Sequence, residues 1–280
     1  MKNCFLKKNQ LKGVFVLILP LLFLIPSIYF QYSAINPFQR GFFCNDENLK
    51  YPYKEKAIIP PFVCLLIWIS LSCSIFLMKR EHFFTEIYHF FLGLSICILL
   101  TNILKYSLGG LRPYFLTVCN PNWNEICFDG DAYYLEIEDN VTYFTHKEYY
   151  RKFVYDANLV CDNMELIKEA RLSSVSGHAS TSFYSAFFII HFLELKFEKT
   201  YFLRFLLQLG TFILSTLISI TRILDFKHHT SDVFWGLLLG VCTAMIIRHN
   251  QNKIFDQTVM GQLYKAPSKD NASVGDNPLN

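Results

Sequence analysis

Six long apolar blocks constrain the fold of this chain more than any other feature. They are Gly13–Tyr32, Ala57–Met78, Phe83–Leu108, Ala179–Leu193, Tyr201–Thr221 and Val233–Ile247. A helix needs about 20 apolar residues to cross the hydrocarbon of a bilayer, and the first two blocks contain no charged residue. The last three are shorter or end in charge, so the polar sequences beside them are expected to complete the spans, shielded by neighbouring helices. The pattern predicts an all-α integral membrane protein, a six-helix bundle.

The domain organisation follows from these blocks. One membrane domain is expected over residues 13–248, between an N-terminal tail of residues 1–12 and a polar tail of residues 249–280 that we expect to be disordered. Hydrophobic residues make up 52% of the chain and are gathered in blocks, which makes the bilayer the expected partner. The net charge of +3 is too small and too dispersed for a nucleic-acid-binding protein.

The orientation in the membrane follows from the cations near the span ends, which all fall on one side if six spans alternate. These cations are Lys2, Lys7, Lys8, Lys12, Lys79, Arg80, Lys196, Lys199, Arg204, Arg248 and Lys253. Because positive charge marks the cytoplasmic side, both termini are expected in the cytoplasm. The Tyr114–Ala170 loop between spans three and four is then extracellular or lumenal. We expect the plasma membrane, with the endoplasmic reticulum and Golgi as alternatives.

Two features of the extracytoplasmic side agree with this orientation. Asn140-Val141-Thr142 is a glycosylation sequon in the long loop, a weak signal by itself. Four cysteines, an even number, would face the oxidising side and allow disulfides without fixing their pairing: Cys44, Cys119, Cys127 and Cys161. No Cys/His spacing resembles a zinc site, so no metal is expected. The long loop has 11 acidic and 4 basic residues, and we expect it to cover a site and not to attract an anion.

The first polar cluster, Lys105 to Pro113, lies at the outward end of the third block. Lys105 and Arg112 would share one face of a continuous helix, about 10 Å apart along its axis, although Gly109, Gly110 and Pro113 disfavour a regular helix here. Interfacial cations that reach lipid head groups are one interpretation. The other is a point charge and a bidentate fork directed at one phosphate.

The second cluster, Ala170 to Ser180, precedes the fourth block. Ser176, Gly177 and His178 would open that helix, where free backbone amides and the helix dipole favour an anion. A serine-rich helix cap beside an interfacial histidine is the simpler interpretation of this cluster alone.

The third cluster, Thr221 to Asp232, separates the last two blocks. His228 and Asp232 are four residues apart and would meet on one helix face. A carboxylate that accepts from one ring nitrogen leaves the other as a base or nucleophile. His229 could compete for Asp232, and Arg222 adds a cation. Three solvated loops would not need this combination, which indicates phosphoryl transfer by positioning and electrostatic stabilisation.

The three clusters together resemble the signature of the type 2 phosphatidic acid phosphatase superfamily, in particular the lipid phosphate phosphatases of animals. The signature is K-x6-R-P, then P-S-G-H, then S-R-x5-H-x3-D. The chain has Lys105-x6-Arg112-Pro113, then Val175-Ser176-Gly177-His178, then Thr221-Arg222-x5-His228-x3-Asp232. The stretch from Arg40 to Glu55 is also similar to the first outer loop of those enzymes.

The resemblance implies a role for each matched residue. His228 would be the nucleophile that forms a phosphohistidine, and Asp232 would orient it. His178 would be the general acid for the leaving alkoxide and then the base that activates water. The phosphate oxygens would be held by Lys105, Arg112, Ser176, Gly177 and Arg222. The family needs no divalent metal, in agreement with the absence of a ligand set in the sequence.

Three positions depart from the family pattern. Thr221 replaces Ser and keeps the hydroxyl, so we expect little effect. Ser174 replaces Phe and Val175 replaces Pro. Loss of the proline removes a constraint on φ, which predicts a less preorganised phosphate loop and lower turnover.

The resulting functional prediction is a metal-independent lipid phosphate phosphohydrolase acting on phosphatidate, lysophosphatidate, sphingosine 1-phosphate or ceramide 1-phosphate. A pyrophosphate-lipid phosphatase of the same superfamily is one alternative. A non-catalytic phospholipid receptor or transporter is another, disfavoured because anion binding alone has no need of an oriented neutral imidazole at His228. The sequence leaves homo-oligomerisation open.

Overall fold

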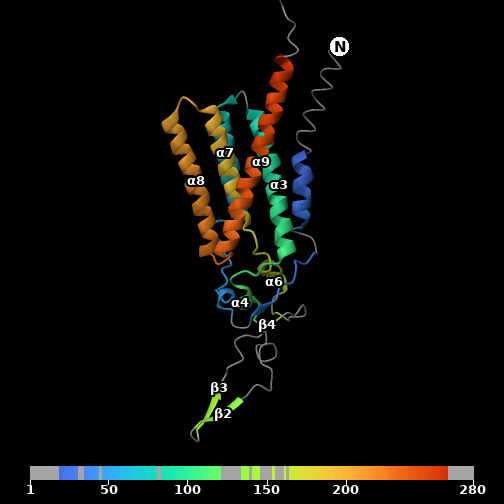
Figure 1. Cartoon of the computed structure of the whole chain (residues 1–280), viewed down its shortest axis with the longest axis vertical. Helices are drawn as coiled ribbons and strands as arrows, with labels where there is room; N and C mark the ends of the chain where they lie inside the picture. The colour runs from blue at the N-terminus through green and yellow to red at the C-terminus, as the bar shows by residue number, and fades with distance from the viewer. Residues whose placement is uncertain are drawn as a thin grey trace, which may run out of the picture.

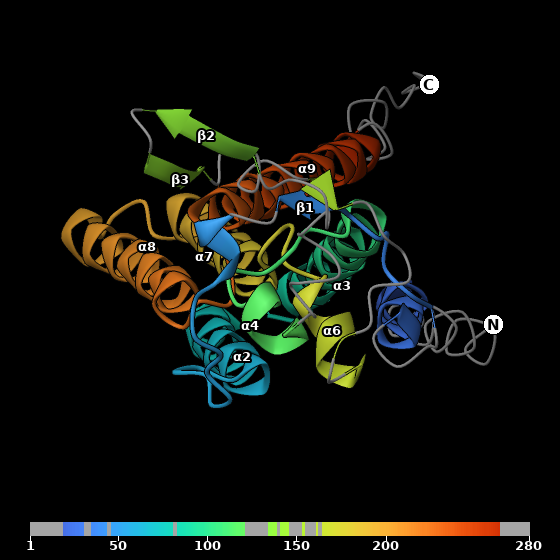
Figure 2. The ribbon, with the colours of Figure 1, turned by 90° about the horizontal axis from the view of Figure 1, so that it is seen from below.

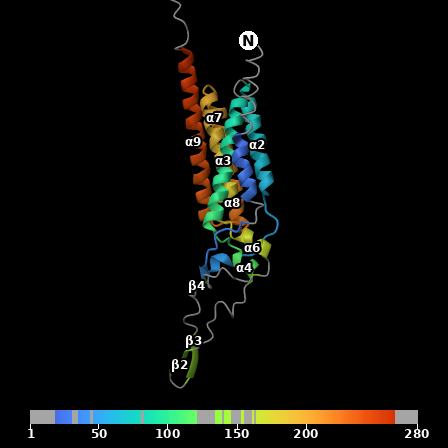
Figure 3. The ribbon, with the colours of Figure 1, turned by 90° about the vertical axis from the view of Figure 1, so that its right-hand side faces the viewer.

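The computed structural model describes residues 19–30, 35–43, 46–80, 83–120, 134–138, 141–145, 153–154, 161 and 164–263 of the 280-residue chain. Long helices run side by side along the molecule (Figures 1 and 3). They are Leu19–Phe30, α2 (Pro61–Leu77), α3 (Phe83–Leu108), α7 (Gly177–Lys196), α8 (Tyr201–Leu224) and α9 (Thr230–Leu263). One helix therefore forms in each of the six apolar blocks, which confirms the predicted helical membrane fold.

Three of the described helical segments are long and apolar enough to cross a bilayer without further support: α3, α8 and residues 230–251 of α9. The Leu19–Phe30 helix and α2 are apolar but shorter. α7 is rich in serine and threonine near its start and is largely buried among the other helices. A helix inside a bundle does not need a wholly apolar surface, because its neighbours and not lipid surround it.

The helix bounds differ from the sequence expectation at the C-terminal end. α9 continues to Leu263, well past Ile247, so the tail expected to be disordered begins as helix. Residues 249–260 contain no proline or glycine, and an existing helix extends without a new nucleation step. Residues 264–280 lie outside the described residues.

The core is aromatic and lies between α2, α3 and α7. Phe76 packs edge-on against Phe192 and Phe90, with ring centroids 4.8 and 6.0 Å apart. These side chains are fully buried. α7 and α9 approach closely because Gly240 has no side chain: a Cβ there would lie 2.3 Å from the carbonyl oxygen of Ser180. The backbones of α7 and α9 are therefore in direct contact at Gly240.

One end of the bundle is closed by a buried ion pair. Arg248 of α9 donates to Glu86 of α3 at 2.6 Å and to the backbone oxygen of Phe188 of α7 at 2.8 Å. The guanidinium also stacks on the Phe188 ring, 3.6 Å from its centroid. Removing one partner of such a buried pair is strongly destabilising, so this contact ties three helices together at the end we call the far end.

The opposite end, which we call the loop end, is where α3 finishes and α7 and α9 begin. Short elements cover it: η1 (Glu47–Leu49), α4 (Phe115–Cys119) and α6 (Met164–Ala170), with strands β1 (Phe42–Phe43) and β4 (Phe153–Val154) paired antiparallel. Figure 2 looks onto this end and shows α4 and α6 in front of the helices. The antiparallel hairpin of β2 (Tyr134–Glu138) and β3 (Val141–Thr145) projects away from the bundle (Figure 1).

A disulfide joins Cys119 at the end of α4 to Cys161 just before α6. Two of the four cysteines expected to face the oxidising side are therefore paired with each other. Cys44, Cys127 and the sequon residue Asn140 lie outside the described residues, so glycosylation at Asn140 stays a prediction.

Candidate active site

The three polar clusters meet at the loop end. The amide of Arg112 donates to the carbonyl of Ala170 at 2.8 Å, which joins the first cluster to the second. The amide of Ser176 donates to the carbonyl of Asp232 at 2.9 Å, which joins the second to the third. The ammonium nitrogen of Lys105 lies 3.7 Å from the position a Cβ on Gly177 would take. Segments far apart in the sequence thus form one polar site.

Arg112 is not on a helix, in agreement with the expectation that Gly109, Gly110 and Pro113 disfavour a regular helix here. α3 ends at Leu108, and Gly109 follows in the left-handed region at φ 52°. A Cβ on Gly109 would lie 1.7 Å from the carbonyl oxygen of Phe38, so only glycine fits this turn. The turn lets the chain leave α3 and bring Arg112 back over the bundle end.

Ser176 occupies the N-cap position of α7, as expected from the sequence, but its side chain makes no capping hydrogen bond. It has extended backbone angles and Gly177 is the first helical residue. The Ser176 hydroxyl is fully buried and makes no hydrogen bond within the described part of the chain. An unpaired buried hydroxyl beside the free amides of a helix start is suited to an anionic oxygen.

Val175, in the position where the family has proline, adopts φ 63°. Proline is locked near −65° and cannot take this conformation. The loop therefore follows a path that a proline could not adopt. The replacement of proline by valine thus changes the conformation of this loop and does not merely loosen it. A β-branched residue in the left-handed region is a strained arrangement, and such strain is found mostly at functional sites.

His228 is oriented by a backbone carbonyl and not by the carboxylate predicted to do so. Its Nδ1 lies 2.8 Å from the carbonyl oxygen of Ser173 and 4.0 Å from Oδ2 of Asp232. A carbonyl can only accept, so Nδ1 carries the proton and Nε2 keeps its lone pair. The expected direct bond fails because α9 begins at Thr230, which leaves His228 outside the helix that contains Asp232.

Asp232 is connected to His228 through Ser173. Its Oδ2 accepts from the Ser173 hydroxyl at 2.6 Å and from the backbone amide of His229 at 3.0 Å. The ring of His229 turns away, with Nε2 donating to the carbonyl of Leu111 at 3.2 Å. Its side chain therefore does not compete for Asp232. Ser173 was not predicted as a site residue, because its only signal in the sequence is its place in the serine-rich second cluster.

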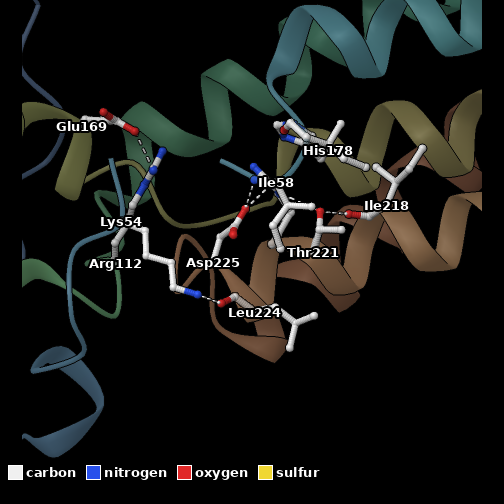
Figure 4. Close-up of polar contacts among 11 residues, drawn as sticks. Lys54, Ile58, Arg112, Glu169, His178, Ile218, Thr221, Leu224 and Asp225 are labelled. Carbon is white, nitrogen blue, oxygen red and sulfur yellow. Dashed lines mark hydrogen bonds and ion pairs between the residues drawn. The ribbon is translucent and has the colours of Figure 1, made fainter. Parts of the chain in front are cut away.

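His178 is fixed by the loop that precedes α2. Its Nε2 donates to the carbonyl oxygen of Ile59 at 3.0 Å, which leaves Nδ1 as the nitrogen available for proton transfer. The close-up in Figure 4 shows His178 on α7 beside Ile58 of this loop. The position of this histidine thus depends on residues more than 100 positions earlier in the chain.

Arg222 is held by Asp225, a residue that the sequence analysis did not assign to the site. The guanidinium donates to Oδ2 of Asp225 at 2.5 Å, and both side chains are buried. The same oxygen accepts from the amide of Ile58 at 2.9 Å (Figure 4). Thr221 accepts from Nε of Arg222 at 3.2 Å, so the hydroxyl it shares with the family serine is in use.

Arg112 is held by Glu169 of α6. Its Nη1 lies 2.7 Å from the Glu169 carboxylate and 3.1 Å from the hydroxyl of Tyr114. The Nε of Arg112 is buried and has no hydrogen-bond partner in the described residues. Figure 4 shows the Arg112–Glu169 pair on the side of the site away from α8.

Lys227 is a further buried cation that the sequence analysis did not single out. Its ammonium lies 4.5 Å from the ring centre of Tyr53 and 5.0 Å from that of Tyr114. Cation–π contacts of this kind compensate part of the cost of burial. The ring of Tyr53 belongs to the loop that precedes α2, which therefore closes over this side of the site.

The environment keeps His228 neutral. Burial lowers the pKa of His228 well below its ordinary value, and the positive charges of Arg112 and Lys105 lower it further. The carbonyl of Ser173 opposes this shift by accepting the Nδ1 proton. At neutral pH the imidazole is therefore uncharged, with a free Nε2 lone pair. An unprotonated nitrogen amid several cations is what an attack on an anionic phosphorus centre requires.

The sequence of the chain also matches a protein family. Residues 86–256 match the PAP2 superfamily, a range that includes all three clusters. Phospholipid phosphatase 1 of Rattus norvegicus is 34% identical over 238 residues, which cover 77% of this chain and 76% of the relative. The mouse protein of the same name (Mus musculus) is also 34% identical, over 81% of this chain and 80% of its own length.

Human phospholipid phosphatase 2 (Homo sapiens) is 27% identical over 85% of this chain and 82% of its own length. No solved structure matches the chain. The chain belongs to the PAP2 superfamily and, within it, to the lipid phosphate phosphatase family of animals. It is a phosphatase, and therefore a hydrolase.

Proposed function

We propose that the protein removes the phosphomonoester from a membrane lipid such as phosphatidate, lysophosphatidate, sphingosine 1-phosphate or ceramide 1-phosphate. The observation that carries this proposal is the neutral His228, with its Nδ1 bound to Ser173 and its Nε2 free, among the cations of the three clusters. The names of the relatives, phospholipid phosphatase 1 and 2, support a phospholipid as substrate.

The first chemical step would transfer the phosphoryl group to the enzyme. Nε2 of His228 attacks phosphorus, the bond from phosphorus to the lipid oxygen breaks, and the leaving alkoxide takes a proton from His178. In this step His178 carries a proton on both ring nitrogens: Nε2–H stays bound to the carbonyl of Ile59, and the Nδ1 proton, which the phosphate monoester brings as its monoanion, goes to the alkoxide. Lys105, Arg112 and Arg222 would stabilise the charge that spreads over the phosphoryl oxygens.

The second step would release inorganic phosphate. His178, now without the proton it donated, accepts a proton from water as the water attacks the phosphohistidine. The phosphorus–nitrogen bond breaks and returns the electron pair to Nε2 of His228. The buried hydroxyl of Ser176 and the amides of Gly177 and His178 would bind phosphate oxygens in both steps.

The proposed reaction uses no metal ion. Among the described residues no three His, Cys, Asp or Glu side chains form a metal-binding group. Metal independence stays a prediction, which phosphate release in the presence of EDTA tests.

We also propose that the loop end faces the extracellular or lumenal side, with both termini in the cytoplasm. This orientation is supported by the cations near the span ends and by the disulfide between Cys119 and Cys161, which is stable in an oxidising compartment. A site at the ends of membrane helices suits a substrate whose acyl chain stays in the bilayer while its phosphate reaches His228.

The proposal is tested by phosphate release from vesicles that each contain one of the four lipids, with EDTA present. Wild-type protein is expected to release inorganic phosphate from at least one of them, and His228→Ala is expected to release none. Activity that needs added magnesium, or that survives in His228→Ala, would refute the mechanism. A pyrophosphate lipid in the same panel separates that alternative substrate class. Lipid binding without phosphate release would indicate a receptor or transporter.

A further inference from the structure

Two carboxylates each bind one of the arginines in the site, and their surroundings differ. Asp225 is 1% exposed, and its Oδ2 is bound by both Arg222 and the Ile58 amide. Glu169 is 46% exposed, and the hydrogen bond the structure gives its side chain is the one from Arg112. One carboxylate is locked inside the fold, whereas the other reaches Arg112 from the solvent side.

The contact of Glu169 occupies a donor that a phosphate would use. Nη1 of Arg112 donates to the carboxylate at 2.7 Å, in the charge-assisted geometry that also recognises phosphate. The Arg112 side chain is only 9% exposed, so the number of anions that can reach it is limited. A phosphate oxygen that approaches Nη1 therefore meets the carboxylate already bound there.

We infer that Glu169 competes with the phosphate group for Arg112, and so weakens the hold of the site on substrate and on the phosphate product. This inference rests on the proposed function, because it takes Arg112 as a phosphate ligand. Asp225 has a different role: it orients Arg222 and stays bound to it whether or not a phosphate is present. Glu169 can leave Arg112 because water solvates its released carboxylate. A buried carboxylate such as Asp225 would stay unsolvated and unpaired if it left its arginine, which costs far more free energy.

The charge of Glu169 also reaches the neighbouring cation of the site. Burial lowers the pKa of Lys227, and among the nearby charges Glu169 opposes this shift most strongly. In the free site the carboxylate therefore partly neutralises two cations. A phosphate dianion that replaces it at Arg112 would meet both of them, which favours exchange over simultaneous binding.

The experiment compares equilibrium binding of inorganic phosphate to the full-length wild-type protein and to Glu169→Gln, both purified in detergent. The inference predicts a Kd about three- to fivefold lower for Glu169→Gln, the size expected from losing a partly exposed ion pair. Glu47→Gln is the matched control, because Glu47 is a solvent-exposed carboxylate paired with a lysine in the first outer loop. It should bind phosphate like the wild type.

The sign of the effect decides between competition and positioning. If Glu169 holds Arg112 in its productive position, Glu169→Gln will bind phosphate more weakly, and an unchanged or raised Kd overturns the inference. Asp225→Asn is expected to raise the Kd, which shows that the assay detects loss of a positioning carboxylate. Glu169→Asp, which shortens the side chain by one methylene, gives the same test with a smaller decrease if the glutamine variant does not fold.

This binding test is independent of turnover. Should the wild type release no phosphate from any lipid, the proposed function fails, but the predicted order of Kd values can still be found or contradicted. Should the wild type be active, KM for the lipid substrate is expected to fall in Glu169→Gln together with the Kd for phosphate. A fall in neither quantity contradicts the competition.

Discussion

Nδ1 of His228 lies 2.8 Å from the carbonyl oxygen of Ser173, and the hydroxyl of the same serine donates to Asp232 at 2.6 Å. One residue thus connects the imidazole to the carboxylate through its two oxygens. The carbonyl sets the tautomer of His228, while the hydroxyl ties the loop before α7 to the first turn of α9. The position of the His228 imidazole depends on this serine as well as on Asp232.

Ser173→Ala should lower kcat about tenfold with a smaller change in KM, because loss of a hydrogen bond to a carboxylate costs about 1.5 kcal/mol or more. Ser70 is the matched control: its hydroxyl donates only to the carbonyl of Ile67, within α2, and Ser70→Ala should keep wild-type kcat. Steady-state phosphate release measures both variants. Equal kcat for Ser173→Ala and wild type would mean that Asp232 orients His228 without the serine hydroxyl.

The buried neutral His228 should make the protein less stable in mild acid. Its pKa lies well below the ordinary value in the folded protein, so below about pH 6.5 the unfolded chain binds a proton that the folded chain does not. Stability therefore falls as pH falls, by about 1 to 1.5 kcal/mol for this group between pH 7.5 and 5.5. His228→Asn, which lacks the titrating group, should lose less over that interval in thermal unfolding. Equal losses would contradict the burial of a neutral imidazole.

Two glycine-to-alanine changes in helices should have opposite effects on stability. In α9, a Cβ on Gly240 would lie 2.3 Å from the Ser180 carbonyl oxygen and 2.8 Å from the Tyr184 amide nitrogen, so Gly240→Ala should be strongly destabilising. In α8, a Cβ on Gly210 would meet nothing within 4 Å, and Gly210→Ala should stabilise by about 0.5–1 kcal/mol through helix propensity. Thermal unfolding in one detergent measures both. A stable Gly240→Ala would show that α7 and α9 are not in backbone contact.

Substitutions at Val175 test the strained loop. Val175→Gly should raise Tm, with a gain of about 0.5–1 kcal/mol, because glycine accepts φ 63° without a steric cost. Val175→Pro, which restores the family residue, should lower both Tm and kcat, because proline cannot adopt a positive φ. If the proline variant were the more stable, the loop would have to follow a path different from the one described here.

Most of the bundle could be predicted from the sequence because the apolar blocks are long. α3 spans Phe83–Leu108 as predicted, and the other long described helices start or end within a few residues of their blocks. The extension of α9 to Leu263 was missed, since a polar sequence with no proline or glycine over residues 249–260 is compatible with disorder as well as with a helix.

The clusters of the site could be predicted, but not the contacts that position them. Spacing placed Asp232 beside His228, whereas the turn before α9 moves His228 to the Ser173 carbonyl. Asp225 and Glu169 were not assigned roles, because a carboxylate finds its arginine through tertiary packing. The contact between His178 and the carbonyl of Ile59 could not be predicted, because every residue has a backbone carbonyl and none is marked in the sequence.

The most direct test of the central claim is whether the phosphoryl group is carried by His228. Full-length protein is mixed with phosphatidate labelled with ³²P in the phosphate, quenched rapidly in alkali, and counted for protein-bound label. The account predicts label in the wild type that is stable in alkali and lost in acid, as expected for phosphohistidine, and no label in His228→Ala. Label that persists in His228→Ala, or that is lost in alkali and kept in acid, would contradict it.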